Sequence, residues 1–226
     1  MLYSGVNNFR KISNDIVVKK EYEKISKKES ENAGEYATHD IGHVLRVVDF
    51  CEKISRLLSL SDNIIDEIKV AALLHDIGIA LDGKDGHAER SYRWAKKYFS
   101  NVNLDEETKN RILEAIRHHS DGTNTVHSRI LTFADKLDVN KHRILPNGLL
   151  LDGNRQYANI EEVAMDISDN VLIINFISNK KINFDELNEY YFTAKIFSAI
   201  ENLASHFNLQ HEVFMDNKKW EARKND

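Results

Sequence analysis

The sequence predicts a mainly α-helical protein: a helical bundle followed by a small C-terminal α+β appendage, made of a β-hairpin and a long helix. Three observations support this. The 226 residues include 9 Gly and a single Pro, so residues that break helices are scarce. Apolar residues recur at steps of three and four along much of residues 38–140, as on one face of a helix. Around residues 163–177 the period changes to two, which is typical of strands.

Composition and charge narrow the class of protein. Apolar residues make up 42% of the chain and charged residues 30%, which suits a packed core with a solvated surface. The formal net charge is −5, whereas domains that bind long nucleic acids are usually basic, so tight binding of long nucleic acid is not expected. Cys51 is the one cysteine, so no intramolecular disulfide can form, as expected in a reducing compartment. We expect no signal peptide and no membrane span, and therefore a cytoplasmic protein.

The N-terminal part of the sequence is polar and rich in charge. We expect a charged peripheral arm at residues 1–35, with a short helix around Ile16 to Ile25.

Helical periodicity begins near Thr38, which we expect to cap the first helix of the bundle, with Asp40 in its first turn. His43 and the apolar residues after it line one face of this helix. Ser61 is expected to cap a second helix, whose inner face ends at His75.

Gly78 and the polar segment 81–86 interrupt the pattern, so we expect a loop there. Three further helices are expected at about residues 87–99, 105–119 and 127–140. The helix at 105–119 is acidic at its start and basic near its end, a polarity that suits the helix dipole.

The character of the sequence changes in the last third of the chain. Residues 163–168 alternate between apolar and polar side chains, Asp169-Asn170 is typical of a turn, and a second strand is expected at 171–177. Asn183 is expected to cap a helix of about 20 residues.

A short strand at 210–215 completes the expected elements. We therefore divide the chain into the arm at 1–35, a helical domain at 36–145 and an α+β appendage at 146–226.

Histidines and aspartates fall at the inner faces and ends of the expected helices. His43 continues the apolar face of the first helix, and His75-Asp76 follow the apolar run 70–74. An ionised aspartate in apolar surroundings is costly unless it is paired or metal-bound. A single inward histidine is more often a hydrogen-bonded core residue than a ligand, so the ordered set as a whole indicates a metal site. Imidazole together with carboxylate suits Mn, Fe, Ni, Co or Zn ions.

Three segments together resemble the HD superfamily of metal-dependent phosphohydrolases. They are the His43-Val44-Leu45-Arg46 segment, the segment Ala71 to Gly78 around His75-Asp76, and Ala134-Asp135-Lys136-Leu137-Asp138. The resemblance covers about residues 38–140 and implies the HD-domain helical bundle. Two more segments resemble histidine segments of subfamilies with two metal ions: Gly86-His87-Ala88-Glu89 and Ala115-Ile116-Arg117-His118-His119.

The resemblance implies a dinuclear centre in which Asp76 bridges two divalent transition-metal ions, Mn, Fe, Ni or Co. The implied ligands are His43, His75, Asp76, His87, His119 and Asp135. His118 stays open as the alternative to His119. The catalytic role is assigned to Asp76 and His75.

Basic residues follow the last of these ligands. Lys136 and Arg143 are candidates for holding the substrate phosphate, as are Lys141 and His142, although a solvated basic face is the simpler interpretation. Many HD relatives have a lysine after His-Asp-x-Gly, where this sequence has Ile79, which leaves the substrate class open.

We therefore predict hydrolysis of a phosphate mono- or diester, of a nucleotide or another small molecule, by attack of a metal-bridging hydroxide. Two alternatives stay open. One is an HD-type di-iron oxygenase, since this resemblance extends to HD oxygenases with the same six ligands. The other is a non-catalytic nucleotide-binding module. The acidic charge favours a small phosphorylated partner over long nucleic acid. The sequence leaves a homo-oligomer open.

Overall fold

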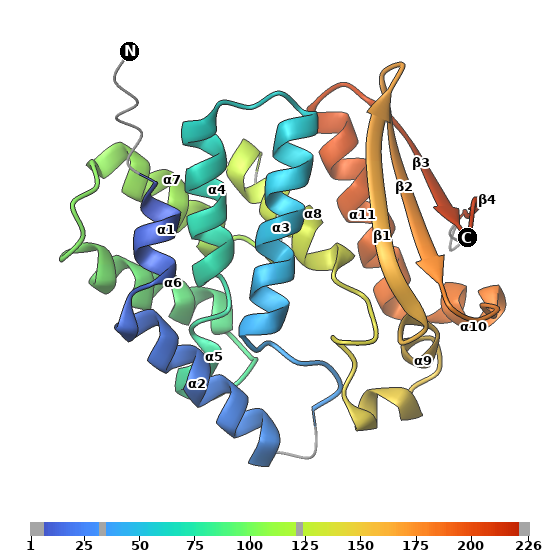
Figure 1. The fold of residues 1–226 in the computed structure, drawn as a ribbon, viewed down its shortest axis with the longest axis horizontal. Helices are drawn as coiled ribbons and strands as arrows, with labels where there is room; N and C mark the ends of the chain where they lie inside the picture. The colour runs from blue at the N-terminus through green and yellow to red at the C-terminus, as the bar shows by residue number, and fades with distance from the viewer. Residues whose placement is uncertain (1–6, 32–34, 121–123, 222–226) are drawn as a thin grey trace. The chain divides into compact units, whose positions relative to one another are not determined.

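The computed structural model describes residues 7–31, 35–120 and 124–221. Contacts divide the chain into two compact units, residues 1–31 with 39–134 and residues 32–38 with 135–226. The prediction of a helical domain followed by a small α+β part is confirmed (Figure 1). In the part that the structure describes, no helix has the length and apolarity needed to cross a membrane.

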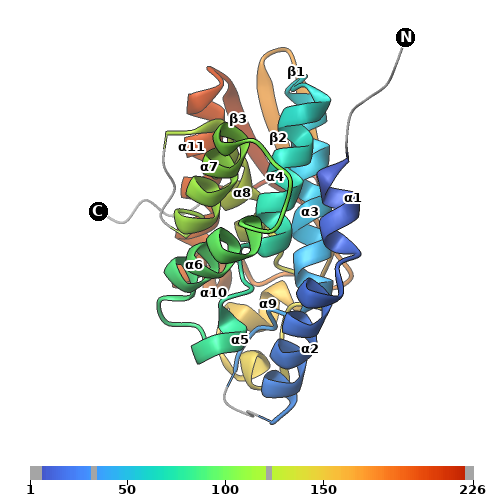
Figure 2. The same ribbon diagram turned by 90° about the vertical axis from the view of Figure 1, so that its left-hand side faces the viewer.

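The first unit consists of helices (Figures 1 and 2). They are α1 (Asn8–Ser13), α2 (Ile16–Glu31), α3 (Ile41–Leu57), α4 (Asp62–Leu74), α5 (Ile79–Asp82), α6 (His87–Phe99), α7 (Glu106–Arg117) and most of α8 (Val126–Leu137). Helix α4 packs against α1, α3 and α7, and α6 packs against α7. All residues of α4 from Val70 to Leu74 are buried, as expected for a helix that is covered on several sides.

Local signals in the sequence set several helix boundaries. The Asp105 carboxylate accepts a hydrogen bond from the Thr108 amide and caps α7. Ser61 precedes α4 as its N-cap residue. The helix predicted at 87–99 coincides with α6, and the one predicted at 127–140 is α8, which ends at Leu137.

The predicted cap of the first bundle helix is wrong. Asp40, and not Thr38, is the N-cap of α3: its carboxylate accepts a hydrogen bond of 3.0 Å from the His43 amide. The Thr38 amide instead donates to the Arg143 carbonyl in the second unit. Both residue types can cap a helix, so the long-range backbone bond decides which one does.

Two segments are more helical than predicted. Helix α2 continues to Glu31 instead of ending near Ile25, and it buries Tyr22 and Ile25. The loop predicted before α6 contains the short helix α5. The Lys28 ammonium of α2 donates to the Ala80 carbonyl at 2.7 Å, so α2 supplies a hydrogen bond that this short helix cannot make internally.

The second unit contains the strands (Figure 1). Its elements are η1 (Pro146–Leu150), α9 (Asn154–Tyr157), β1 (Ile160–Ser168), β2 (Val171–Ser178), α10 (Phe184–Glu189), α11 (Tyr191–His206), β3 (Gln210–Met215) and β4 (Lys218–Lys219). The strand order is β1-β2-β3-β4. The predicted hairpin is confirmed: β1 and β2 are antiparallel, and Asp169 and Asn170 have the positive φ angles that a two-residue hairpin turn requires.

The connection from β2 to β3 carries α10 and α11. Strand β3 runs parallel to β2, with Ile174 opposite Val213, and α11 packs against β3. Alternate residues of β2 (Leu172, Ile174, Phe176) are fully buried. They form the apolar face of the sheet.

The single long helix predicted after Asn183 is wrong, because α10 and α11 are separate helices. Tyr190 between them has an extended backbone (φ −75°, ψ 124°). Its side chain packs so closely on Gly153 that a Cβ there would lie 2.2 Å from the Tyr190 Cβ. Tertiary packing therefore overrides the helical periodicity at this point.

Candidate metal centre

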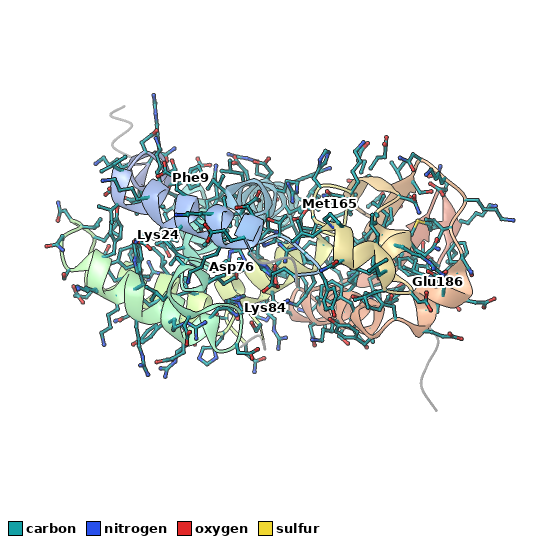
Figure 3. The ribbon with its side chains drawn as sticks, turned by 90° about the horizontal axis from the view of Figure 1, so that it is seen from below. Phe9, Lys24, Asp76, Lys84, Met165 and Glu186 are labelled. Atoms are coloured by element: carbon teal, nitrogen blue, oxygen red, sulfur yellow. The ribbon has the colours of Figure 1, made fainter. Side chains whose placement is uncertain are left out.

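The C-terminal end of α4 carries two polar residues into the interior of the first unit. His75 is 0% and Asp76 is 2% exposed. The Tyr22 hydroxyl of α2 donates to the Leu73 carbonyl, which holds this end of α4 against α2. Figure 3 labels Asp76 among the helices of the unit.

Four histidines surround the Asp76 carboxylate. They come from α3, the end of α4, the start of α6 and the end of α7. Oδ2 of Asp76 lies 3.5 Å from Nε2 of His43 and 3.3 Å from Nε2 of His75. Oδ1 lies 3.1 Å from Nε2 of His87 and 3.6 Å from Nε2 of His119. Each carboxylate oxygen therefore faces its own pair of imidazoles.

Three of these histidines each make the same type of hydrogen bond, from the ring nitrogen Nδ1 to a backbone carbonyl. Nδ1 of His75, His87 and His119 each lies 2.7 Å from the backbone carbonyl three residues earlier. A carbonyl can only accept, so Nδ1 carries a hydrogen and Nε2 is the ring nitrogen left to bind a metal ion. Metal-binding histidines commonly have this arrangement.

The separations around Asp76 fit a metal centre. Nε2 of His87 and Nε2 of His119 lie 2.8 Å apart. With a hydrogen on each Nδ1, these two Nε2 atoms are the ring nitrogens close enough to bind one cation together. Ligands about 2.1 Å from an ion and at right angles to each other are about 3.0 Å apart. The separations from 2.8 to 3.6 Å around this carboxylate are close to that value.

The charge state of Asp76 also suits a ligand. Burial raises the pKa of its carboxyl, but the neighbouring His75, His43 and His87 outweigh this effect and hold the pKa well below its ordinary value. The group is therefore an anion at neutral pH and can bind a cation.

A close helix contact positions His87. A Cβ on Gly78 would lie 2.4 Å from the Ser91 amide nitrogen and 2.6 Å from the His87 carbonyl oxygen, so the first turn of α6 can approach this closely only at a glycine. The Gly78 amide donates to Ser91 Oγ at 2.9 Å. Arg90 donates to the carbonyls of Gly78, Gly83 and Asp85, and so ties the α5 loop to α6.

The sequence analysis did not single out Arg90 or Ser91. The sequence does place both residues shortly after His87. Residues in the first turns of a helix are well placed to bind the loop that precedes it, as Arg90 does here.

A group of described residues could hold a metal ion. In the first unit this group consists of His75, Asp76 and His119, whose ligand atoms lie within 4.8 Å of one another. Asp135 lies in the last turn of α8 and is 9% exposed. Imidazoles and carboxylates without thiolates suit the transition-metal ions expected from the sequence.

Of the two adjacent histidines after α7, the structure places His119 beside Asp76. His119 is 1% exposed, whereas His118 is half-buried and caps the helix. The geometry therefore agrees with the choice of His119 that the resemblance implies, and its role as a ligand stays a prediction.

The candidate substrate residues have partners within the second unit. Lys136 Nζ lies 2.6 Å from Asp135 Oδ2. Arg143 Nη1 lies 3.9 Å from Asp138 Oδ2. Lys141 pairs with Glu161 at 2.9 Å. Their part in holding phosphate stays a prediction, and so does that of His142.

The region that carries the site matches a known family. Residues 40–140, which contain all six expected ligands, match the model of the HD domain family. The solved structure of a predicted HD superfamily hydrolase from an uncultured Thermotogales bacterium is 28% identical, with 54% of this chain and 67% of that chain covered and a TM-score of 0.42. No curated protein matches the chain.

Proposed function

Since residues 40–140 match the model of the HD domain family, we propose that the protein is a metal-dependent phosphohydrolase with a dinuclear centre. The ions are divalent transition metals such as Mn, Fe, Ni or Co. The residues that hold them are His43, His75, Asp76, His87, His119 and Asp135. One observation carries the proposal: the two oxygens of Asp76 each face a separate pair of imidazoles.

The protein's own groups provide the binding and the charge for such a centre. Asp76 contributes one negative charge shared between two sets of imidazoles, and the backbone carbonyls hold three of the rings with Nε2 directed at it. When bound, the ions lower the pKa of coordinated water and neutralise charge that develops on phosphate oxygens. Lys136 and Arg143 are the cations we assign to the substrate phosphate.

The substrate we propose is a small phosphate ester, such as a nucleotide. The net charge of −5 disfavours a long nucleic acid, whose binding depends on many basic contacts. Both monoesters and diesters are compatible with the site.

The test begins with metal-free protein and adds Mn ions back. Release of p-nitrophenol is measured from p-nitrophenyl phosphate and bis(p-nitrophenyl) phosphate. Wild type is compared with Asp76→Ala and with Asp166→Ala, a control that removes an exposed strand carboxylate. We expect turnover with metal in wild type and in the control, and none in Asp76→Ala.

The preferred ester then identifies the substrate class. If wild type binds metal but hydrolyses neither ester, the phosphohydrolase proposal is wrong. Oxygen consumption by iron-loaded protein would then favour the oxygenase alternative, and its absence would favour a binding module.

A further inference from the structure

A second buried polar cluster lies in the first unit, away from the metal centre. Glu67 of α4 is 7% exposed, and three side chains hydrogen-bond to its carboxylate: Arg111 and Thr108 of α7, and His127 of α8. Thr108, Arg111 and His127 lie 41, 44 and 60 residues from Glu67 along the chain, so the cluster forms only when the helices pack together.

The hydrogen-bond geometry of this cluster is close to ideal for an ion pair between the buried Glu67 carboxylate and the partly exposed Arg111 guanidinium. Arg111 donates from Nε to Oε2 and from Nη2 to Oε1 of Glu67, both at 2.7 Å. His127 Nε2 lies 2.8 Å from Oε2, and Thr108 Oγ1 lies 3.3 Å from Oε1. The carboxylate thus accepts four hydrogen bonds, about the number its two oxygens can take. A bidentate pair of this kind adds directional specificity as well as energy.

The three helices joined by this cluster also carry candidate ligands, at a constant spacing. Glu67 precedes His75 by eight residues on α4. Arg111 of α7 precedes His119, which lies two residues after the end of that helix, by eight residues. His127 likewise precedes Asp135 by eight residues on α8. The cluster therefore joins the helices about two turns before the expected ligands.

Such a cluster can set the axial register of helices. Apolar packing between helices tolerates small slides and rotations, because many arrangements bury similar area. A bidentate ion pair does not, since a shift of an ångström breaks its hydrogen bonds and leaves a buried charge unsatisfied. Metal ligands in turn must be held to within about 0.5 Å of their productive positions.

We propose that Glu67, Arg111 and His127 are positioning residues for the metal centre. They fix the relative register of α4, α7 and α8, and through it the spacing of the ligands that these helices carry. The inference rests on the proposed function, since it assumes that the ligands bind metal.

The test measures the dissociation constant of Mn ions by calorimetry at a temperature well below the unfolding midpoint of every variant. We expect Glu67→Gln and His127→Ala to bind Mn at least tenfold more weakly than wild type, as for other residues that orient ligands without touching the ion. His127→Gln, whose side-chain amide can still donate to Glu67, should restore most of the affinity.

A matched control separates positioning from stability. Ile12→Ala creates a cavity under α1, a helix without expected ligands, and should lower the unfolding midpoint without changing Mn affinity. If Glu67→Gln and His127→Ala lose stability but keep wild-type affinity, the cluster is structural only and the inference is wrong. If Glu67→Gln does not fold, His127→Ala and its rescue by His127→Gln decide.

The two proposals fail in different ways. If Asp76→Ala also binds Mn like wild type, the metal centre itself is misassigned and the proposed function fails. If Asp76→Ala loses Mn while both cluster variants keep it, only the positioning role is wrong.

Discussion

Replacing Gly78 with alanine should damage the metal centre without touching an expected ligand. The added Cβ would lie 2.4 Å from the Ser91 nitrogen and 2.6 Å from the His87 carbonyl oxygen, both backbone atoms that cannot rotate away. Ordinary contacts of a Cβ begin at 3.4 Å, so the first turn of α6 must retreat by about 1 Å. His87 would move with it, away from Asp76 Oδ1, from which it is now 3.1 Å.

The magnitude follows from this displacement. Overpacking of this size costs about 1–3 kcal/mol in the free energy of unfolding. A misplacement of about 1 Å at a catalytic group costs up to about 100-fold in rate, and we expect Mn affinity to fall by about 10–100-fold. Calorimetric titration gives the affinity, and thermal unfolding of the metal-free protein gives the stability.

Gly148→Ala is the matched control. A Cβ at Gly148 would lie 2.2 Å from the Tyr36 carbonyl oxygen, so it creates a comparable overlap within the second unit. This variant should lose stability and keep its Mn affinity. Wild-type Mn affinity in Gly78→Ala would refute the reasoning that the approach of α6 sets the position of His87.

Three further predictions concern single side chains. His119→Ala should weaken Mn binding at least tenfold, whereas His118→Ala should stay within about twofold, measured by the same titration; equal effects would contradict the placement of His119 beside Asp76. Asp40→Ala removes the α3 cap and should cost about 1 kcal/mol in thermal unfolding, with Asp40→Asn close to wild type; an unchanged midpoint in Asp40→Ala would show that the cap contributes nothing. Burial raises the pKa of Glu67, but Arg111 and His127 lower it from 4.5 to about 2; the ionised group therefore stabilises the fold above pH 4.5, by about 3 kcal/mol at most, and this is lost as the pH falls towards 2. Acid unfolding of Glu67→Gln should be less steep in that range, and an identical slope would count against the pairing.

The parts of the fold that the sequence predicted are those with local causes. The period of 3.6 and the cap at Asp105 depend on neighbouring residues, so α6 and α7 were found close to their observed bounds. The hairpin turn at Asp169-Asn170 has a similarly local signal, the tolerance of these residues for positive φ.

The parts that were missed depend on contacts distant in sequence. Thr38 and Asp40 can both cap a helix, and the amide of Thr38 is bonded to the Arg143 carbonyl, more than a hundred residues away. The break at Tyr190 results from its packing on Gly153, which no periodicity reveals.

The candidate site shows the same contrast. His75-Asp76 were conspicuous because polar residues followed an apolar run. The partners of Glu67, in contrast, come from two other helices, so nothing near Glu67 or His127 in the sequence indicated their pairing.

The strand order of the sheet has a consequence for folding during synthesis. Strand β2, with the sequence Val-Leu-Ile-Ile-Asn-Phe-Ile-Ser, can pair with β1 as soon as their two-residue turn closes. Its other edge pairs with β3, and Val171 meets Gln210 only after α10 and α11 have been synthesised and folded. Until then a nascent chain exposes an apolar, uncharged strand edge, which is a template for aggregation. Fragments that end before Gln210 should therefore precipitate, and folding after synthesis should depend on how quickly α11 covers this strand.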